Sequence, residues 1–275
     1  MEEDAIELVG QENGSISLIM VGIHGDEACG INALESILPS LSVRRGKVLF
    51  VYGNPRAIAK SVRFTEKNLN RMFKAEKLLS IEEKGSYEYQ RAEFLKKYLD
   101  QADALLDIHA SHTPDSKPFI ICESSAREII GHLPLDLVVS GFDKLEPGGS
   151  DSYMNNQGKI GICVECGYLG DSKSIMVAEE TIMAFLKARG HIDGKLDTIT
   201  QEFVQMCSIY ITKTNDFKLT KKFSDFEQVA AGRIIGTDGE LPVTVNENSI
   251  ILFARNRQKI GEEAFLVGKY KKSLM

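Results

Sequence analysis

Several features that would place the chain in a membrane or outside the cell are missing from its sequence. No apolar run approaches the ~18 residues that a membrane-spanning helix needs. The first ten residues, MEEDAIELVG, are acidic and lack the basic and apolar regions of a signal peptide. Five cysteines, an odd number in a chain of 275 residues, do not indicate a disulfide framework. We therefore expect a cytoplasmic protein without a membrane segment.

Positive charge is also scarce. The chain carries 33 basic and 39 acidic side chains, which give a formal net charge of −6. This balance argues against a nucleic-acid or membrane-surface partner, although a local positive pocket is compatible with it. Hydrophobic residues make up 43% of the chain and charged residues 26%, as in ordinary globular proteins with a core. The composition leaves the oligomeric state open, and a homo-oligomer is compatible with it.

The first two-thirds of the chain alternate strand-like and helix-like segments. Residues 15–23, 46–55 and 102–110 are short apolar runs that are typical of buried strands. Residues 86–101 and 172–190 carry apolar residues at helical spacing. Three later segments add strand candidates: KPFIICES, LPLDLVVSG and KIGICVECG. This alternation predicts an α/β fold in which helices cover a sheet.

The character of the sequence changes at about Thr200. Short β-like runs separated by turn signals then follow one another: SIYITKT, VAAGRIIG, LPVTV, SIILFAR and AFLVGKY. The sequence contains no internal repeat, low-complexity segment or long flexible linker. We therefore divide the chain into an α/β domain at residues 1–198 and a smaller all-β domain at residues 199–275.

A histidine and a carboxylate lie three residues apart where the first predicted strand ends. In the stretch VGIHGDEACG, His24 and Glu27 occupy a glycine-flanked turn before a helical segment. Ligands of α/β sheets gather at the carboxyl ends of strands, and His109 ends another predicted strand. Two histidines and one carboxylate are a ligand set of catalytic zinc. The alternative interpretation is a helix-capping carboxylate beside a surface histidine.

Arginines gather in the segment GNPRAIAKSVRFTEKNLNRMF, which follows the second predicted strand. The segment holds Arg56, Arg63 and Arg71 and is too broken to form one helix. Because planar guanidinium groups bind carboxylates through two parallel hydrogen bonds, this segment is a candidate for recognising an anionic substrate. The alternative is a set of ordinary surface arginines, with Asn68 and Asn70 in turns.

A glutamate stands inside an otherwise apolar predicted strand, GICVECGYLGD. Burying the carboxylate of Glu165 is costly unless it is paired or functional, and a nearby metal would favour its ionisation. A general base and a structural carboxylate paired with an arginine are the two interpretations. Cys163 and Cys166 flank it as a C-x-x-C motif, but residues three apart in a strand face opposite sides, so we expect buried free thiols.

Other residues near these motifs give weaker signals. Asp107 precedes His109 by two residues on the same strand face, so it either orients that histidine or forms a buried salt bridge. His112 is expected in a loop, in a supporting or solvent role rather than as a ligand. His132 and His191 are expected at the surface.

Four motifs occur together in a fixed order: GIHGDE, NPRA…R…NLNRMF, DIHAS and VECG. They extend over residues 22–167, and with this order the chain resembles the succinylglutamate desuccinylase/aspartoacylase family of the zinc carboxypeptidase-like superfamily. The resemblance implies a zinc carboxypeptidase-like mixed sheet covered by helices. It also implies a smaller C-terminal all-β domain that shapes the entrance to the active site.

The resemblance further implies a reaction and a role for particular residues. The reaction is zinc-dependent hydrolysis of the amide bond in a small N-acyl amino acid or a related substrate that bears a carboxylate, with Glu165 assisting the attack of a water on the metal. One Zn²⁺ per subunit would be the cofactor. The implied residues are the zinc ligands His24, Glu27 and His109, the catalytic residues Glu165 and Arg63, and the substrate-binding residues Asn70, Arg71 and Arg56.

The chain departs from the family pattern in two places. Asn68 stands where the family often has aspartate, and the segment between Tyr153 and Glu165 lacks the arginine by which aspartoacylases bind the second substrate carboxylate. Lys159 is the only cation there. The substrate therefore stays open between N-acyl amino acids other than N-acetylaspartate and compounds with one carboxylate. A zinc carboxypeptidase acting on peptides and a non-catalytic binding protein are the alternative functions.

Overall fold

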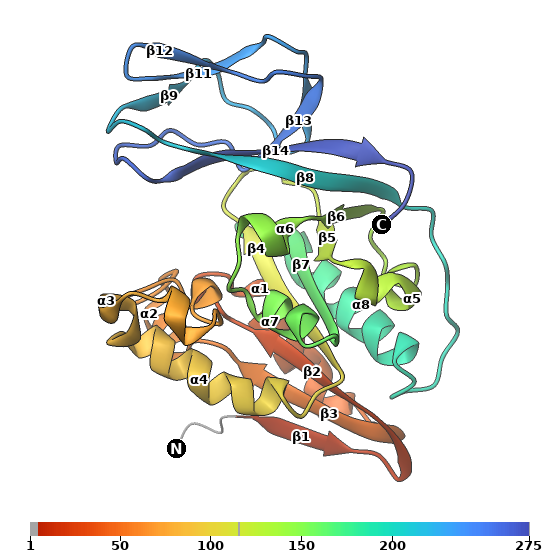
Figure 1. The fold of residues 1–275 in the computed structure, drawn as a ribbon. Helices are drawn as coiled ribbons and strands as arrows, with labels where there is room; N and C mark the ends of the chain where they lie inside the picture. The colour runs from red at the N-terminus through yellow and green to blue at the C-terminus, as the bar shows by residue number, and fades with distance from the viewer. Residues whose placement is uncertain (1–4, 115, 275) are drawn as a thin grey trace.

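One large mixed sheet runs through the molecule, and a second, three-stranded sheet lies near one end of it (Figure 1). The computed structural model describes residues 5–114 and 116–274. The order of the eleven strands in the large sheet is β1-β3-β2-β4-β7-β5-β6-β8-β14-β13-β10. Four neighbouring strands are parallel: β3 (Arg45–Tyr52), β2 (Glu12–Val21), β4 (Ala104–Ser111) and β7 (Ile160–Tyr168). The edge strand β1 (Ile6–Val9) is antiparallel to β3.

The large sheet continues without a break into the C-terminal part of the chain. β5 (Phe119–Cys122) is antiparallel to β7, whereas β6 (Leu137–Ser140) is parallel to β5 and to β8 (Glu202–Ile211). The sheet ends with three antiparallel strands, β14 (Glu263–Lys271), β13 (Ser249–Leu252) and β10 (Glu227–Val229). The smaller sheet consists of β12 (Leu241–Thr244), β11 (Ile234–Asp238) and β9 (Phe217–Leu219).

Helices cover both faces of the parallel strands (Figure 1). α1 (Cys29–Ile37) and α8 (Lys173–Ala188) pack together on one face, and α4 (Tyr87–Leu99) and α7 (Ser150–Asn156) lie on the other. The shorter helices are α2 (Pro55–Lys60), α3 (Ile81–Lys84), α5 (Arg127–Ile130) and α6 (Phe142–Leu145). Residues 189–201 connect α8 to β8, so the domain boundary predicted after residue 198 falls in this connection.

Alternate residues of β2 enter two separate hydrophobic cores. Ile19 and Val21 belong to the core beneath α1 and α8, whereas Leu18 and Met20 belong to the core beneath α4. All four side chains are fully buried. This two-sided burial explains why the strand is a continuous apolar run instead of an alternating one, as expected for parallel strands covered on both faces.

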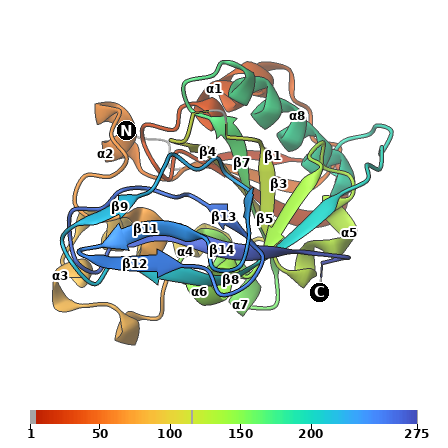
Figure 2. The same ribbon diagram turned by 90° about the horizontal axis from the view of Figure 1, so that it is seen from above.

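A third core joins the α/β part to the C-terminal strands. Phe119 of β5 and Val139 of β6 pack in one cluster with Val204, Leu252 and Leu266. Seen from above, the C-terminal strands lie in front of α4, α6 and α7 (Figure 2). The predicted fold class, a mixed sheet covered by helices with a smaller β-rich C-terminal part, is confirmed. Within the described residues, no helix combines the length and the apolar character that crossing a membrane requires.

The prediction that His191 lies at the surface is wrong. Its side chain is 1% exposed, with Nδ1 2.8 Å from the carbonyl oxygen of Arg45 and Nε2 2.8 Å from the hydroxyl of Ser17. Both partners belong to the N-terminal strands, more than 140 residues earlier in the chain. His191 thus ties the chain after α8 to the sheet, a contact that no local sequence pattern indicates.

The turn after β2 depends on glycine. Gly22 adopts a φ of +67°, a left-handed conformation that side chains disfavour. A Cβ atom on Gly25 would lie 2.0 Å from the backbone carbon of Ala57 in α2, far inside van der Waals contact. α2 therefore packs directly on the backbone of this turn. The same turn holds His24 and Glu27.

We expect Gly25→Ala to destabilise the protein by about 1–3 kcal/mol, because the new methyl group must push α2 away from the turn. Urea denaturation followed by circular dichroism measures the change. Gly85→Ala is the matched control, since Gly85 has a negative φ and a methyl group added there would lie 3.6 Å from its nearest non-neighbouring atoms. The control should stay within about 0.5 kcal/mol of wild type. Equal stabilities of the two variants would contradict the packing argument.

Candidate active site

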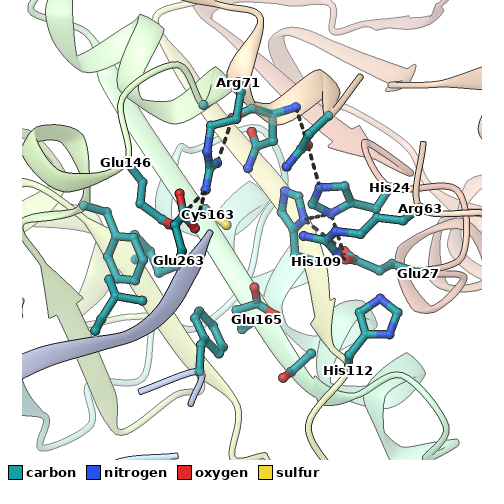
Figure 3. A pocket seen from close by; sticks show the side chains of 18 of the residues that line it. His24, Glu27, Arg63, Arg71, His109, His112, Glu146, Cys163, Glu165 and Glu263 are labelled. Carbon is teal, nitrogen blue, oxygen red and sulfur yellow. Dashed lines mark hydrogen bonds and ion pairs between the residues drawn. The ribbon is translucent and has the colours of Figure 1, made fainter. Parts of the chain in front are cut away.

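The polar residues singled out in the sequence meet at the carboxyl ends of the parallel strands (Figure 3). His24 and Glu27 follow β2, His109 lies near the end of β4, and Glu165 lies in β7. The Cα atoms of His109 and Glu165 are register partners on neighbouring strands. Because β2, β4 and β7 are parallel, their ends share one edge of the sheet, and the three strands deliver these side chains to one place.

His24, Glu27 and His109 form a buried triad. Oε1 of Glu27 lies 2.7 Å from Nδ1 of His24, and Oε2 lies 2.9 Å from Nδ1 of His109. The two Nδ1 atoms are 3.2 Å apart. None of the three residues is more than 3% exposed. Three potential ligand atoms thus converge on one point, as a metal centre requires.

The outer nitrogen of each imidazole faces an oxygen atom. Nε2 of His24 lies 3.1 Å from the side-chain oxygen of Asn68, and Nε2 of His109 lies 3.3 Å from Oδ2 of Asp107. A proton on each Nε2 leaves the lone pair of each Nδ1 directed at the carboxylate of Glu27. Two lone pairs and a carboxylate repel one another unless a cation lies among them. This donor set therefore fits a divalent metal ion, and outer contacts of this kind orient metal-binding histidines in general.

Charges in the triad are mutually dependent. Burial opposes ionisation of Glu27, but His24 and His109 hold the pKa of its carboxyl well below its usual value. Burial lowers the pKa of His24, which favours the neutral imidazole that a metal needs. Burial also opposes a charge on His109, yet Asp107 and the other neighbouring acidic groups raise its pKa well above the ordinary value. A metal ion at this point competes with a proton on His109.

Glu165 lies beside the triad, and no hydrogen bond or ion pair holds its carboxyl group within the described residues. Its Oε2 atom is buried and makes no hydrogen bond within the described part of the chain. Burial, together with the negative charge of Glu27, raises the pKa of Glu165 to about 7. Arg63 stands close by, with Nη1 donating a 2.8 Å hydrogen bond to Oε1 of Glu27. A carboxyl group that titrates near neutrality is suited to moving a proton.

A cavity of about 370 Å³ lies in front of these groups. The C-terminal part of the chain contributes six of its lining residues, Phe253, Arg255, Arg257, Glu263, Phe265 and Leu266. The two arginines among them were not predicted from the sequence. Their only local signal is the pair of arginines in FARNR directly after a predicted strand, and nothing in the sequence places that segment over the ends of β4 and β7.

Arg71 is already paired inside the cavity (Figure 3). Its Nη2 atom lies 2.9 Å from Oε1 of Glu146 and 3.9 Å from Oε2 of Glu263. Nη1 donates a 2.9 Å hydrogen bond to the backbone oxygen of Asn70. Burial raises the pKa of Glu146 to about 8, against the opposing effect of Arg71 and with the support of the nearby Glu263. This end of the cavity thus holds an arginine with two carboxyl groups.

Not every residue named from the sequence reaches the cavity. Arg56 is exposed and stacks its guanidinium 4.0 Å from the ring centre of Tyr87, away from the cavity lining. His112 does line the cavity, and its Nε2 lies 3.2 Å from Oδ2 of Asp26. Cys163 and Cys166 are free and buried in different cores, as the strand geometry predicts.

The fold and the site together define an α/β protein with a candidate metal centre at the carboxyl ends of parallel strands. Residues 13–189 match the model of the succinylglutamate desuccinylase/aspartoacylase catalytic domain. The chain therefore belongs to this family of deacylating hydrolases, and the resemblance based on four motifs is confirmed.

Relatives match nearly the whole chain at low identity. Succinylglutamate desuccinylase from Shewanella sp. strain W3-18-1 is 23% identical over 287 residues, covering 93% of this chain and 83% of that protein. The structure of succinylglutamate desuccinylase from Vibrio cholerae superposes with a TM-score of 0.81 at 19% identity, over 98% of this chain and 88% of that one. A succinylglutamate desuccinylase/aspartoacylase from Rhodobacter sphaeroides gives 0.75 at 19% identity, over 97% and 89%. These structural likenesses concern the fold.

We expect wild-type protein to retain one zinc ion per chain after dialysis, and His24→Ala to lose it, because the variant lacks one of three converging ligand atoms. Mass spectrometry of the metal content measures the difference. His132→Ala is the control, since Nδ1 of His132 contacts the backbone oxygen of Asp197 outside the cavity. Full zinc occupancy in His24→Ala would show that His24 is not a zinc ligand.

We also expect Glu146 to make stability depend on pH. Its pKa is about 8 in the folded protein against 4.5 as the reference, so the folded state binds this proton more tightly. The resulting stabilisation is complete below pH 4.5 and is lost as the pH rises through 8, with a slope of at most about 1.4 kcal/mol per pH unit. Glu146→Gln should flatten this slope in urea denaturation between pH 6 and 9.

The exposed Glu240, in the turn between β11 and β12, supplies the control for this measurement. Glu240→Gln should leave the pH dependence of stability as it is in wild type. An unchanged slope in Glu146→Gln would show that the carboxyl group of Glu146 is already ionised at neutral pH.

Proposed function

We propose that the protein is a zinc-dependent amidohydrolase that removes the acyl group from a small N-acyl amino acid or a related substrate that bears a carboxylate. The observation that carries this proposal is the convergence of His24, Glu27 and His109 beside an unpartnered Glu165 in one cavity. Membership of a family of deacylases agrees with it. The products would be a carboxylic acid and a free amino acid.

His24, Glu27 and His109 would hold the zinc ion through two imidazole nitrogens and a carboxylate oxygen. Catalytic zinc sites in proteins use three such ligands and keep one position open. When bound, the ion supplies a Lewis acid for the scissile carbonyl and lowers the pKa of water. Asn68 and Asp107 support this arrangement, because each faces the outer nitrogen of one histidine.

Glu165 would move the proton in the reaction. Its free Oε2 atom can accept a proton from the water that attacks the amide carbon. The same carboxyl group can then protonate the departing amine nitrogen, so that one side chain serves both half-steps. Water would be consumed and the C–N bond broken, with no group left on the enzyme.

Arg63, Asn70 and Arg71 would position the substrate. The guanidinium of Arg63 reaches the metal-binding triad through Glu27 and can stabilise negative charge that develops on the carbonyl oxygen. Asn70 and Arg71 line the same cavity, with Arg71 at the end that holds Glu146 and Glu263, and would hold a substrate carboxylate, which fixes the scissile bond relative to Glu165. The carboxyl groups of Glu146 and Glu263 offset part of the positive charge of Arg71 at this end of the cavity.

Residues 199–275 would act as a domain that narrows the entrance. Phe253 and Phe265 of the C-terminal part line the cavity together with residues from the strand ends. A cavity of about 370 Å³ favours a small molecule over a peptide chain. The partner we propose is therefore a small-molecule N-acyl amino acid.

We expect zinc-loaded wild-type protein to release a primary amine from at least one N-acyl amino acid in a panel. The panel comprises N-acetylaspartate, N-succinylglutamate and acetylated amino acids with one carboxylate. Glu165→Gln should retain zinc and lose about 10²–10⁴-fold in turnover, because it cannot accept the proton. A fluorogenic amine assay measures release, and metal analysis of the same samples verifies occupancy.

Three other outcomes would point elsewhere. Undiminished turnover in Glu165→Gln removes Glu165 from the role of general base. Release of C-terminal residues from peptides, with no activity on the panel, would indicate a carboxypeptidase. Zinc binding without turnover on any substrate would indicate a binding protein that retains the fold.

A further inference from the structure

An arginine from the C-terminal part lines the cavity, and its guanidinium has no partner among the described residues. Arg255 lies in the segment between β13 and β14, where its backbone N–H donates a 2.9 Å hydrogen bond to the carbonyl of Ala264. Its side chain lines the same cavity as Glu165. Among residues 5–114 and 116–274, no side chain or backbone oxygen forms a hydrogen bond or an ion pair with its guanidinium.

The surroundings of Arg255 make an unpaired charge unfavourable. Burial lowers its pKa, and the positive charges of Arg257 and Arg63 act in the same direction, whereas Asp225 and Glu165 oppose them. A guanidinium nevertheless stays protonated at any physiological pH, so it cannot avoid the cost by losing its charge. A partly buried cation that keeps its charge is stabilised by an anion.

Of the two acidic groups near Arg255, Asp225 and Glu165, the first is already engaged with other partners. One carboxylate oxygen of Asp225 accepts a 3.0 Å hydrogen bond from the backbone N–H of Phe253, and the other accepts a 2.8 Å hydrogen bond from the hydroxyl of Ser116. The carboxylate thereby holds the start of the segment that carries Arg255. Asp225 positions this segment, and within the described residues neither Asp225 nor Glu165 forms a hydrogen bond or an ion pair with the guanidinium of Arg255.

The other cations that could bind a substrate anion are less available. Arg63 is paired with Glu27, and Arg71 is paired with Glu146. Lys159, the only cation in the segment between Tyr153 and Glu165, donates hydrogen bonds of 3.1 and 2.7 Å to the backbone oxygens of Leu99 and Asp100 at the end of α4. Arg257, the other cavity arginine between β13 and β14, donates a 2.6 Å hydrogen bond from Nε to the backbone oxygen of Glu263. Of the four arginines that line the cavity, Arg255 is therefore the one whose guanidinium makes no hydrogen bond or ion pair within the described residues.

We propose that Arg255 binds a carboxylate of the substrate and thereby helps to decide which N-acyl amino acid the enzyme accepts. Specificity would then lie in the C-terminal part instead of the segment between Tyr153 and Glu165. Guanidinium groups bind carboxylates through paired, charge-assisted hydrogen bonds. This inference rests on the proposed function, because it assigns a further contact within the same cavity.

The carboxylate bound by Arg255 is distinct from the one assigned to Asn70 and Arg71. Arg71 lies with Glu146 and Glu263 on one side of Glu165, and Arg63 lies with the metal-binding triad on the other side (Figure 3). Arg255 lies close enough to Arg63 and Glu165 that the charges of both affect its pKa. A substrate held at both points carries two carboxylates, one of them in the acyl group or in the side chain of the amino acid.

The test compares substrates that differ only in one carboxylate. The isosteric pairs are N-acetylaspartate with N-acetylasparagine, N-acetylglutamate with N-acetylglutamine, and N-succinylglutamate with its succinyl monoamide. For wild-type protein we expect higher kcat/KM for the carboxylate member of at least one pair. Arg255→Met should reduce that preference by at least about ten-fold, which corresponds to about 1.4 kcal/mol for the loss of a hydrogen bond to a charged group.

Matched variants separate this role from a structural one. Arg233→Met removes an exposed arginine of the C-terminal part outside the cavity and should leave both members of each pair unchanged. Arg255→Lys, which keeps the charge, should retain part of the preference. The melting temperature of Arg255→Met should be no lower than that of wild type, because the guanidinium has no partner to lose in the described structure and its charge is partly buried.

Two results would overturn the inference. Equal losses on both members of every pair would show that Arg255 does not recognise a carboxylate, and an unchanged preference would show the same. A binding measurement keeps this test independent of turnover: N-acetylaspartate and N-succinylglutamate are titrated calorimetrically into zinc-loaded Glu165→Gln, with and without Arg255→Met. Weaker binding in the double variant supports the inference even if the panel shows no hydrolysis, which would count only against the proposed function.

Discussion

The buried carboxylate of Glu27 is the group on which the site depends. It contacts His24 in the turn after β2, His109 and the backbone N–H of Ala110 in β4, and Arg63 after α2. A charge that is 2% exposed must be compensated locally, so these contacts constrain three separate segments to one geometry. The same constraint aims the imidazole nitrogens at a common point, which is why a structural requirement and a metal-binding requirement coincide here.

Strand direction extends this arrangement to the rest of the cavity. The parallel pairing of β2, β4 and β7 is sufficient to place Glu165 beside His109. Because the sheet continues through β6 and β8, the C-terminal strands are attached to the same framework that carries the candidate metal ligands. Arg255 and Glu263 can therefore face the strand ends from a fixed position. The α/β part and the C-terminal part of the chain thus both contribute residues to the cavity lining.

Much of the fold and of the site could be predicted from the sequence. The apolar run of β2, the glycine-flanked turn and the helical spacing of α8 are local patterns, and local sterics and burial decide them. His24, Glu27, His109 and Glu165 stand at or near predicted strand ends, so their meeting follows from a parallel sheet. The positions of Arg56 and His191 did not follow from such local patterns. Arg56 stacks on Tyr87 away from the cavity, and His191 is buried against strands from the N-terminal part of the chain.

The sequence by itself determined which residues are candidates for the chemistry, because motif spacing and strand ends are properties of neighbouring residues. Only the tertiary structure decided which charges are paired. Arg71 contacts Glu146 and Glu263, and Lys159 donates to backbone oxygens. Arg255 lines the cavity, and within the described residues its guanidinium is unpaired. Most of these pairings join segments that lie tens to nearly two hundred positions apart. Sheet order and register bring such segments together, and no local pattern of residues encodes the outcome.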